Sequence, residues 1–578
     1  MGFRVETDVM VPMRDGITLA TDLWIPESGP TSTLLVRTPY SKDSMTLGAD
    51  LTPNAYALVE AGYAVAWQDV RGTCRSHGQF APHMDDSRDG ADTIAWLRAQ
   101  PWCDGTIGTF GKSYLGFTQW ASASQAPAGL AAIAPTTTSS DYYRAPWYSD
   151  GGALSWLTVW SWGVQKAILE AKTAVDAGDG DAATLQELTR LAADPQLYLN
   201  TMPISDQPVL IKHAPWWLDW LRHPQRDQFW QDLAVVDRFD QVTVAALHVG
   251  GWFDLFVNNT TRSFTRMRAE AASTQARDGQ RLIIGPWDHQ YQMGAYHDRQ
   301  FGLAGDAVTA EITGAHIAFF DRHLRRRTDA LDEVAPVRIF VMGVDQWRDE
   351  QDWPLPDTHY VPYYLDGNGH AHTAKGDGIL TTTPPSAQAA NTYQYDPARP
   401  VPSLGGRALT LAALNAVGPV DQRLTETRAD VLCFTTPVLT QPVEVTGHIS
   451  LVLHVTSSAR DTDFTGKLVD VFPDGRAIYL TDGILRTRYR NSLSEPEFLQ
   501  PGQPYEITLD LAVTSNVFLP GHHIRLEISS SNFPRYDRNT NTGGIIADET
   551  LDHAVIATNQ VLHGPNHPSR LVLPIIDR

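Results

Sequence analysis

Ser113 stands out chemically because it lies in the glycine-rich hexapeptide Gly-Lys-Ser-Tyr-Leu-Gly, residues 111–116. The run before it, residues 106–110, is typical of a buried strand, and residues 117–125 are typical of a helix. A sharp strand-to-helix turn exposes a serine hydroxyl and directs the next backbone N–H at a developing oxyanion. The usual motif, Gly-X-Ser-X-Gly, has one residue fewer before its last glycine, so the match is not strict. An ordinary glycine-rich turn explains the hexapeptide equally well.

A serine nucleophile needs a base to take its proton and a third group to orient that base. Where the nucleophile sits on such a turn, the chain order is Ser, then Asp or Glu, then His. Asp254 and His289 each follow an apolar run and fall in this order. Singly, each is explained as a loop residue, but three strand-end residues in the required order predict a catalytic triad of Ser113, Asp254 and His289. Asp288 is a rival acid, although the sequence neighbour of His289 is badly placed to support its ring.

Tyr40 ends another apolar run, Val-Arg-Thr-Pro-Tyr at residues 36–40. Folds with this kind of turn recruit a second oxyanion donor from this position, and a phenol hydroxyl can serve as that donor. A tyrosine that caps a loop with its hydroxyl explains the residue equally well, so the residue pattern leaves both interpretations open.

Other chemistries find little support in the sequence. It has no HExxH motif, no Walker loop, no GxGxxG motif and no pair of CxxC motifs. The three cysteines, Cys74, Cys103 and Cys433, are too few for a disulfide framework. The loop histidines lack the spacing of metal ligands. We therefore expect neither a metal ion nor a cofactor.

The elements that must position these residues alternate between strand and helix over residues 1–144. Buried strands are predicted at 33–36, 63–67, 106–110 and 130–134, with helices at 54–61 and 88–99. Residues 145–240 have helical spacing, and strand signals return at 244–249 and 281–284. This order predicts a mostly parallel sheet with helices on both faces, interrupted by a helical cap at 145–240 and completed by residues 241–354.

Residues 355–578 have a different pattern. Apolar and polar residues alternate at 505–511 and 523–528, and Pro-Gly and Pro-Asp-Gly turns recur. This pattern predicts antiparallel strands with one solvent-facing side, in a β-sandwich or jelly roll.

Composition excludes some partners. The formal charge of −21 repels phosphate backbones, which argues against nucleic-acid binding. No apolar run is long enough to span a bilayer, and the first residues lack the apolar core of a signal peptide. We expect a cytoplasmic protein that acts on a small molecule. The sequence allows a homo-oligomer and does not decide the oligomeric state.

Longer segments carry a specific family resemblance over nearly the whole chain. They include the segments Trp-Cys-Asp-Gly-Thr-Ile-Gly-Thr-Phe-Gly-Lys-Ser-Tyr-Leu-Gly at 102–116, Arg-Ala-Pro-Trp-Tyr at 144–148, Gly-Gly-Trp-Phe-Asp at 250–254, Gly-Pro-Trp-Asp-His at 285–289 and Ser-Asn-Val-Phe-Leu-Pro-Gly-His-His-Ile at 515–524. They resemble the bacterial cocaine esterase-like (CocE/NonD) hydrolases, relatives of the X-Pro dipeptidyl peptidases and α-amino acid ester hydrolases. The nucleophile turn of this family is itself Gly-X-Ser-Tyr-X-Gly.

The resemblance implies a serine carboxylesterase with an α/β-hydrolase core, a helical cap and a C-terminal jelly roll. It assigns Ser113 as nucleophile, His289 as base and Asp254 as orienting acid, and it matches the Tyr40 hydroxyl and the Tyr114 backbone N–H to the oxyanion hole. It also implies that four residues surround the acyl group: Trp147, Trp162, Phe256 and Leu409. Thr410 stands where the family has a phenylalanine, so we expect a roomier acyl pocket.

Two other functions remain compatible with the sequence. A peptidase or α-amino acid ester hydrolase on the same scaffold would need a carboxylate cluster for the substrate ammonium, and none is evident around the cap. A catalytically silent carbohydrate-binding protein would use the jelly roll and would not need the triad.

Overall fold

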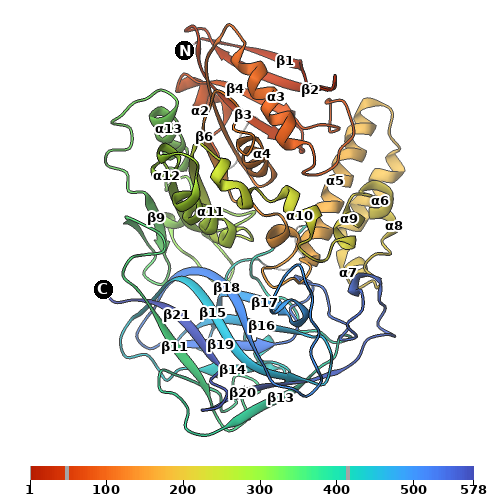
Figure 1. The fold of residues 1–578 in the computed structure, drawn as a ribbon, viewed down its shortest axis with the longest axis vertical. Helices are drawn as coiled ribbons and strands as arrows, with labels where there is room; N and C mark the ends of the chain where they lie inside the picture. Colours follow the sequence, from red (N-terminus) through yellow and green to blue (C-terminus); the bar gives the residue numbers. More distant parts are fainter. Residues whose placement is uncertain (1, 46–50, 412–416) are drawn as a thin grey trace.

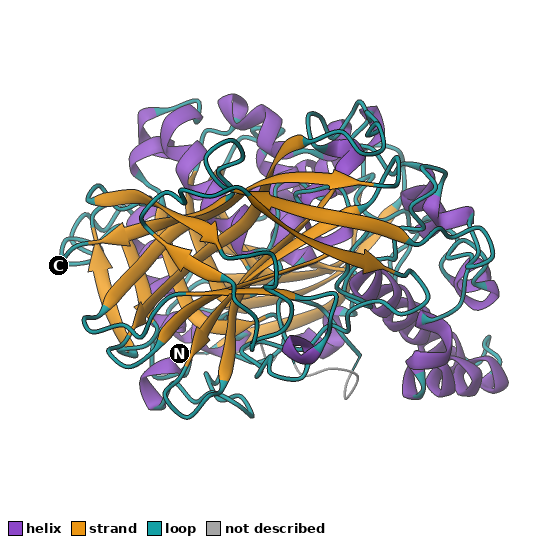
Figure 2. Ribbon diagram, turned by 90° about the horizontal axis from the view of Figure 1, so that it is seen from below, coloured by secondary structure: helices purple, strands orange, loops and turns teal. Residues whose placement is uncertain are grey.

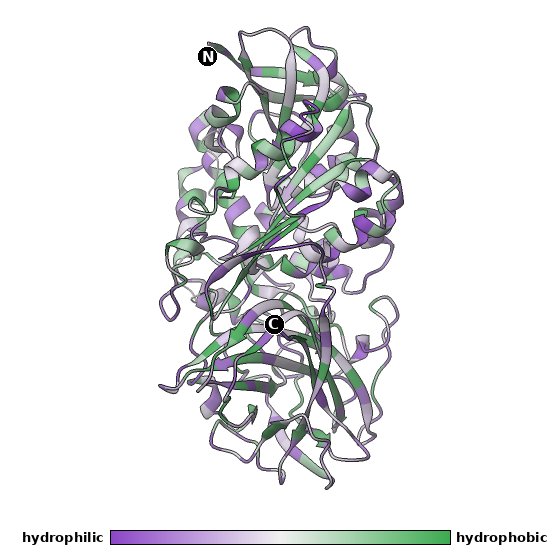
Figure 3. Cartoon of the chain, turned by 90° about the vertical axis from the view of Figure 1, so that its left-hand side faces the viewer, coloured by the Kyte–Doolittle hydropathy of each residue, from purple (hydrophilic) through white to green (hydrophobic). Residues whose placement is uncertain are grey.

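The computed structural model describes residues 2–45, 51–411 and 417–578, and these residues form two large sheets with helices around the first (Figure 1). The second sheet lies at the opposite end of the long axis from the N-terminus (Figure 1). Figure 2 shows the strands of both sheets from below, with helices around the margin. Hydrophobic segments follow the strands of both sheets (Figure 3).

The first sheet has the strand order β1-β2-β4-β3-β5-β6-β7-β8-β9-β10. Its centre, from β4 to β9 along this order, is parallel, and β1, β2 and β10 pair antiparallel at the edges. The strands are β1 (Phe3–Pro12), β2 (Thr18–Pro26), β3 (Thr31–Thr38), β4 (Ala64–Asp69), β5 (Cys103–Lys112), β6 (Leu130–Thr136), β7 (Ala245–Phe253), β8 (Arg281–Asp288), β9 (Val337–Val341) and β10 (Gln346–Glu350).

Both faces of this sheet are apolar and covered, as parallel sheets require. On β3, Leu34 and Val36 belong to the core under α2 and α13, whereas Leu35 belongs to the core under α3 and α4. Helices α11 and α12 add to the second of these cores. These helices are α2 (Ala55–Glu60), α3 (Asp86–Arg98), α4 (Tyr114–Ala123), α11 (Val257–Glu270), α12 (Thr274–Asp278) and α13 (Ile312–His323).

The strands predicted from apolar runs are confirmed as β3 to β8, and the helices predicted at 54–61 and 88–99 are α2 and α3. Strands β1, β2, β9 and β10 were not predicted. Most residues of β1 are at least partly exposed, so its sequence lacks an apolar run. Short or polar edge strands give a weak signal of this kind.

Between β6 and β7 the chain is helical, as predicted. The α-helices are α5 (Trp156–Ala177), α6 (Ala182–Ala193), α7 (Pro195–Leu199), α8 (Pro208–His213), α9 (Trp217–Arg222) and α10 (Gln228–Leu233). The first of them starts at residue 156, not 145, because residues 137–155 form loops and one short π-helix that contains Pro146. Proline cannot donate a helical hydrogen bond.

The second sheet has the order β13-β20-β15-β21-β11-β12-β14-β19-β16-β17, with β18 paired to β15. Its pairs are antiparallel except for one parallel contact between β12 and β14. The strands are β11 (Thr358–Asp366), β12 (Ile379–Thr381), β13 (Ala389–Tyr395), β14 (Leu432–Thr435), β15 (Val443–Ser457), β16 (Asp463–Val471), β17 (Ala477–Arg486), β18 (Tyr505–Phe518), β19 (His523–Ser529), β20 (Ala557–His563) and β21 (Arg570–Ile576).

The predicted alternation of buried and solvent-facing residues is confirmed at the start of β18 and is wrong for β19. In β18, Ile507 and Leu509 are buried while Glu506 and Thr508 are exposed. In β19 the polar residues Arg525 and Glu527 are buried as well. Arg525 Nη1 lies 2.7 Å from Glu426 Oε2, and Lys467 Nζ lies 3.2 Å from Glu527 Oε2. Ion pairs therefore cover the side predicted to face solvent.

The first sheet ends at Glu350 and the second begins at Thr358. The predicted division at residue 354 falls in the segment between them, and the domain boundaries themselves stay predictions. Within the described ranges, no helix is both long and apolar enough to cross a membrane.

Candidate active site

Ser113 sits on a tight turn between β5 and α4. Its backbone has φ 63° and ψ −122°, a conformation that residues other than glycine rarely adopt. Gly111, with φ 140°, allows the turn to close, because a Cβ there would lie 2.6 Å from Leu115 Cβ. The Thr138 hydroxyl donates to the Ser113 carbonyl at 2.7 Å, and the Ser113 N–H donates to the Thr136 carbonyl at 3.0 Å. The turn is thus held by the neighbouring strand.

Asp254 and His289 follow β7 and β8 and reach Ser113 from the adjacent strand ends. His289 Nε2 lies 3.1 Å from Ser113 Oγ, and His289 Nδ1 lies 2.7 Å from Asp254 Oδ2. The other Asp254 oxygen, Oδ1, accepts from the Phe256 backbone N–H at 2.7 Å. Asp254 is fully buried and His289 is 7% exposed. The structure therefore aligns a hydroxyl, an imidazole and a carboxylate in one hydrogen-bonded chain.

Asp288, the alternative candidate for the acid that orients His289, binds backbone N–H groups instead. Its Oδ1 accepts from the backbone N–H groups of Gln290 at 2.6 Å and Tyr291 at 2.8 Å. Burial raises the pKa of this carboxyl. Asp288 closes the turn that follows β8 and thereby holds the backbone next to His289.

Tyr40 lines the same cavity as Ser113 and His289. Trp162 Nε1 donates to Tyr40 Oη at 2.8 Å. Burial raises the pKa of Tyr40 to about 12, although hydrogen bonds with Trp162 and Ser113 oppose the shift. The phenol therefore keeps its proton at neutral pH. Because an indole N–H can only donate, Tyr40 Oη accepts from Trp162 and can give its own proton elsewhere.

Tyr114 is the first residue of α4, so its backbone N–H is among the helix N–H groups that lack an intrahelical acceptor. Its side chain is used otherwise. The Tyr114 hydroxyl donates to Asp86 Oδ2 at 2.7 Å and accepts from the His83 backbone N–H at 2.8 Å. The ring stacks on Trp162 with an interplanar angle of 3°. These contacts fix the start of α4 beside Ser113.

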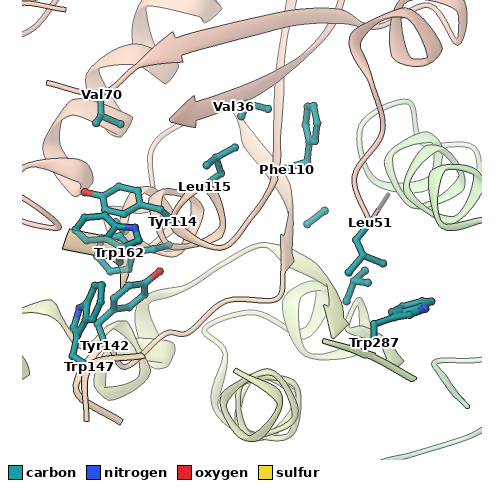
Figure 4. Close-up of a cluster of buried hydrophobic side chains, with 14 of the residues drawn as sticks. Val36, Leu51, Val70, Phe110, Tyr114, Leu115, Tyr142, Trp147, Trp162 and Trp287 are labelled. Carbon is teal, nitrogen blue, oxygen red and sulfur yellow. The ribbon is translucent and has the colours of Figure 1, made fainter. Parts of the chain in front are cut away.

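A cavity beside Ser113 is lined by all the residues expected around the acyl group: Trp147, Trp162, Phe256 and Leu409. Figure 4 shows Trp147, Trp162, Tyr114 and Tyr142 gathered together. The Trp147 ring meets Trp162 edge to face at 5.3 Å between centroids, and it stacks on Trp220 at 3.9 Å. The free space is about 20 Å³, room for about one water molecule. These rings therefore close on one another in this conformation.

Thr410 is not among the residues that line this cavity, and the expectation of a roomier pocket stays a prediction. Thr410 is buried, and its hydroxyl donates to the Leu411 carbonyl at 3.0 Å. Gln290 Nε2 donates to the Thr410 carbonyl at 3.0 Å. The Leu409 backbone N–H donates to Thr158 Oγ1 at 3.3 Å. These bonds hold the segment so that Leu409, and not Thr410, reaches the cavity.

Sequence reasoning missed several lining residues, among them Pro146, Thr158, Leu255 and Tyr142. Leu255 lies between the predicted residues Asp254 and Phe256, so its position was a usable signal. Tyr142 gave no such signal: its hydroxyl lies 3.4 Å from Thr138 Oγ1, and its place in the wall depends on a loop of irregular structure.

A second cavity, of about 50 Å³, shares Pro146, Thr158 and Leu255 with the first. Charged residues line it, but their carboxylates are paired. Asp482 lies against Arg407 and Arg535. The carboxylate of Asp150 contacts Arg144 and Arg262. The carboxylate of Asp510 contacts His448 and Arg262. The part of the chain that the structure describes contains no group of three or more His, Cys, Asp or Glu residues that could hold a metal ion.

Family models match two segments of the chain. Residues 15–291 match the X-Pro dipeptidyl-peptidase (S15 family) model, which spans Tyr40, Ser113, Asp254 and His289. Residues 329–572 match the X-Pro dipeptidyl-peptidase C-terminal non-catalytic domain. The first match covers most of the first sheet, and the second covers most of the all-β part.

Individual proteins match over the full length. Cocaine esterase of Rhodococcus sp. (strain MB1 Bresler) is 49% identical over 578 residues, covering 100% of this chain and 99% of that protein. A solved α-amino acid ester hydrolase is 26% identical with a TM-score of 0.82, covering 99% of this chain and 96% of the other. A solved aminopeptidase from a Thaumarchaeota archaeon of marine sediment has the same identity and TM-score and covers 100% and 96%.

Proposed function

This chain belongs to the family of serine hydrolases that includes bacterial cocaine esterase, and we propose that it hydrolyses carboxylic esters through an acyl-enzyme formed on Ser113. One observation carries the proposal: the hydrogen-bonded chain from Ser113 Oγ through the His289 ring to Asp254 Oδ2. Such a chain activates a hydroxyl that is otherwise a weak nucleophile.

In the first half-reaction, Ser113 Oγ attacks the ester carbonyl carbon while His289 Nε2 takes the hydroxyl proton. Asp254 accepts from His289 Nδ1, which fixes the tautomer and stabilises the imidazolium. The carbonyl π electrons move to oxygen, and the tetrahedral intermediate collapses when the alcohol leaves with the proton from His289. Water then attacks the acyl-enzyme by the same proton transfers, which releases the acid and restores Ser113.

The negative oxygen of each intermediate needs donors that are already in place. We assign this role to the Tyr40 hydroxyl and the Tyr114 backbone N–H. The Trp162 hydrogen bond supports the Tyr40 role, because Tyr40 Oη accepts in it and still has its own proton to donate. The helical N-terminus at Tyr114 supports the second role, because its N–H groups carry a partial positive charge.

We further propose that residues 145–240, which include helices α5 to α10, form a cap over a hydrolase core made of residues 1–144 and 241–354, and that residues 355–578 form a jelly roll. Two cap residues in the cavity lining, Trp147 and Trp162, support this arrangement. Leu409, from the C-terminal part, supports a site shared by three parts of the chain.

The substrate class follows from the lining of the cavity. Trp147, Trp162 and Phe256 present apolar rings, which favour an uncharged acyl group. Because the free space is close to that of one water molecule, the rings must move apart to admit an acyl chain. We therefore expect small aliphatic acyl groups to be accepted with the least rearrangement.

An X-Pro dipeptidyl peptidase or an α-amino acid ester hydrolase is the second candidate, favoured by the S15 family match and by the two solved structures. Either activity needs a free carboxylate for the substrate ammonium. The carboxylates of the neighbouring cavity already pair with arginine or histidine, and this favours the simple ester. A carbohydrate-binding protein without catalysis would make no use of the aligned Ser113 and His289.

Turnover rates measured with p-nitrophenyl esters, X-Pro amides and amino acid esters distinguish these candidate functions. Turnover of simple esters, abolished in Ser113→Ala while the protein still folds, would support the proposal. A fluorophosphonate should label Ser113 in the unmodified protein. Faster turnover of X-Pro amides would favour the peptidase, and no turnover with intact folding would favour the binding protein.

A further inference from the structure

Helix α5 contacts the Tyr40 turn at two points one helical turn apart. Trp162 Nε1 donates to Tyr40 Oη at 2.8 Å, and Lys166 Nζ donates to the Pro39 carbonyl at 2.7 Å. Residues four apart lie on the same face of a helix. One face of α5 therefore forms hydrogen bonds with both the hydroxyl of Tyr40 and the backbone carbonyl immediately before it.

Lys166 is an unusual residue for this place because it is buried, with 1% of its side chain exposed. Its Nζ lies 4.6 Å from the centre of the Phe80 ring and 3.6 Å from Glu170 Oε1. Glu170 is partly exposed, and 3.6 Å exceeds the usual length of a charge-assisted hydrogen bond. Burial lowers the pKa of Lys166. An apolar side chain would occupy this position without the cost of burying an ammonium group.

The Tyr40 turn is held from its other side by the core. The Tyr40 backbone N–H donates to Thr38 Oγ1 at 3.0 Å, and the Val70 backbone N–H donates to the Thr38 carbonyl at 2.9 Å. These bonds fix the end of β3 and the nitrogen of Tyr40. The Lys166 bond fixes the Pro39 carbonyl, which belongs to the peptide group that links Pro39 to Tyr40. Loss of this bond would let the peptide plane and the Tyr40 ring shift together.

We propose that Lys166 is a positioning residue that holds the Tyr40 hydroxyl at the place where the oxyanion forms. This inference rests on the oxyanion role given to Tyr40 in the proposed function. Lys166 touches no reacting atom, and it acts through the Pro39 carbonyl. The cap helix would thereby contribute to catalysis as well as to the acyl wall.

The test compares Lys166→Met with Lys172→Met. Methionine keeps an unbranched chain and removes the N–H donors, whereas Lys172 is an exposed lysine of the same helix, ion-paired with Asp176. Rates are divided by the number of serines titrated with a fluorophosphonate, so unfolded protein does not count. We expect Lys166→Met to lower kcat about 10- to 100-fold with little change in KM, because misplacement by about 1 Å costs this much. Lys172→Met should leave kcat unchanged.

A second readout separates positioning from general damage. In the Tyr40→Phe background there is no hydroxyl to position, so Lys166→Met should lower kcat less than about twofold further. An equal loss in both backgrounds would overturn the inference. Affinity for a phenylboronic acid, which mimics the tetrahedral oxyanion, should fall in Lys166→Met by the same factor as kcat/KM.

Two further variants keep the test decisive. If Lys166→Met does not fold, Lys166→Gln takes its place, since its side chain ends one atom short of the Lys166 ammonium and removes the charge. Glu170→Gln removes the partner charge but leaves the Pro39 bond, and it should keep full kcat. A loss in Glu170→Gln as large as that in the Lys166 variant would assign the effect to the ion pair. If Tyr40→Phe alone has full kcat, the oxyanion role proposed for Tyr40 is contradicted, and with it the positioning role of Lys166.

Discussion

The hydrogen bond from the Trp162 indole to the Tyr40 oxygen sets the direction in which the phenol can act. A phenol oxygen that accepts one hydrogen bond still has its own proton to donate, and burial keeps that proton in place by raising the pKa of Tyr40 to about 12. In the ground state the carbonyl oxygen carries little charge, so a donor held at this point is most useful once the charge develops.

Replacing Tyr40 with phenylalanine removes this donor and little volume. We expect kcat to fall by about 10²–10³ with KM nearly unchanged, because the lost interaction belongs to the transition state. Steady-state kinetics with p-nitrophenyl acetate checks this. An effect on KM alone would mean that Tyr40 binds the substrate and does not stabilise the oxyanion.

Leu409 and Thr410 form a matched pair for testing the acyl pocket. Leu409 lines the cavity and Thr410 does not. Leu409→Ala should enlarge the space and shift kcat/KM towards butyrate or hexanoate esters over acetate by about 1–3 kcal/mol, the usual scale for apolar pocket changes. Thr410→Ala should leave this ratio unchanged. The reverse result would restore Thr410 to the pocket.

At the scale of elements, the sequence predicted the strands that are marked by continuous apolar runs. Strands β3 to β8 are buried on both faces, so each appears as a continuous apolar run, and the residues at their ends could be placed in order. The edge strand β1 could not be predicted because it buries little. The closeness of Trp162 to Tyr40 could not be predicted either. It depends on how the inserted helix packs on the sheet, and tertiary packing has no local signal.

Strand β19 shows a second limit of pattern reading. Polar residues at alternate positions predict a face in contact with water, but Arg525 and Glu527 are buried because Glu426 and Lys467 reach them from other segments. Periodicity identifies which residues share a face. It does not reveal what covers that face.

The Arg525–Glu426 pair gives a prediction at this scale. Arg525→Met leaves the Glu426 carboxylate buried beside an apolar side chain, and breaking a buried pair in this way costs about 3–5 kcal/mol. The free energy of unfolding, measured by urea denaturation and circular dichroism, should fall by this amount. Arg525→Met combined with Glu426→Leu should recover most of the loss, since no lone charge remains. A double variant as unstable as the single one would contradict this explanation.

At the scale of the whole molecule, the all-β part supports the segment that carries Trp147. The Leu157 backbone N–H donates to the Pro534 carbonyl at 3.0 Å, and the Leu154 backbone N–H donates to Asp537 Oδ1 at 3.0 Å. Arg486 in turn binds Asp537 and Asp463 from within the second sheet. The position of the segment that carries Trp147 therefore depends on how the two sheets dock.

The core of the first sheet contains buried histidines that make stability depend on pH. His248 on β7 lies with Nε2 2.7 Å from Gln280 Oε1, and His316 on α13 lies with Nδ1 2.9 Å from the Ile312 carbonyl. Burial lowers the pKa of each to about 4, because the imidazolium form would lose its hydration. In the unfolded chain both titrate near 6.5. Between about pH 6.5 and 4 the unfolded state therefore binds more protons, and stability falls as the pH falls.

Each of these histidines should destabilise the fold by about 2 kcal/mol between pH 7 and pH 5, from the difference between the two pKa values. His248→Gln and His316→Gln remove a titrating ring but keep a polar side chain, so each variant should lose about 2 kcal/mol less than the wild type over this interval. Urea denaturation at the two pH values measures these differences, and comparison with the wild type cancels the opposite contribution of Asp69 and Asp463, whose pKa values burial raises to about 6. Equal pH dependence in wild type and both variants would mean that these rings are protonated within the folded protein, and that water reaches the core beneath β7 and α13.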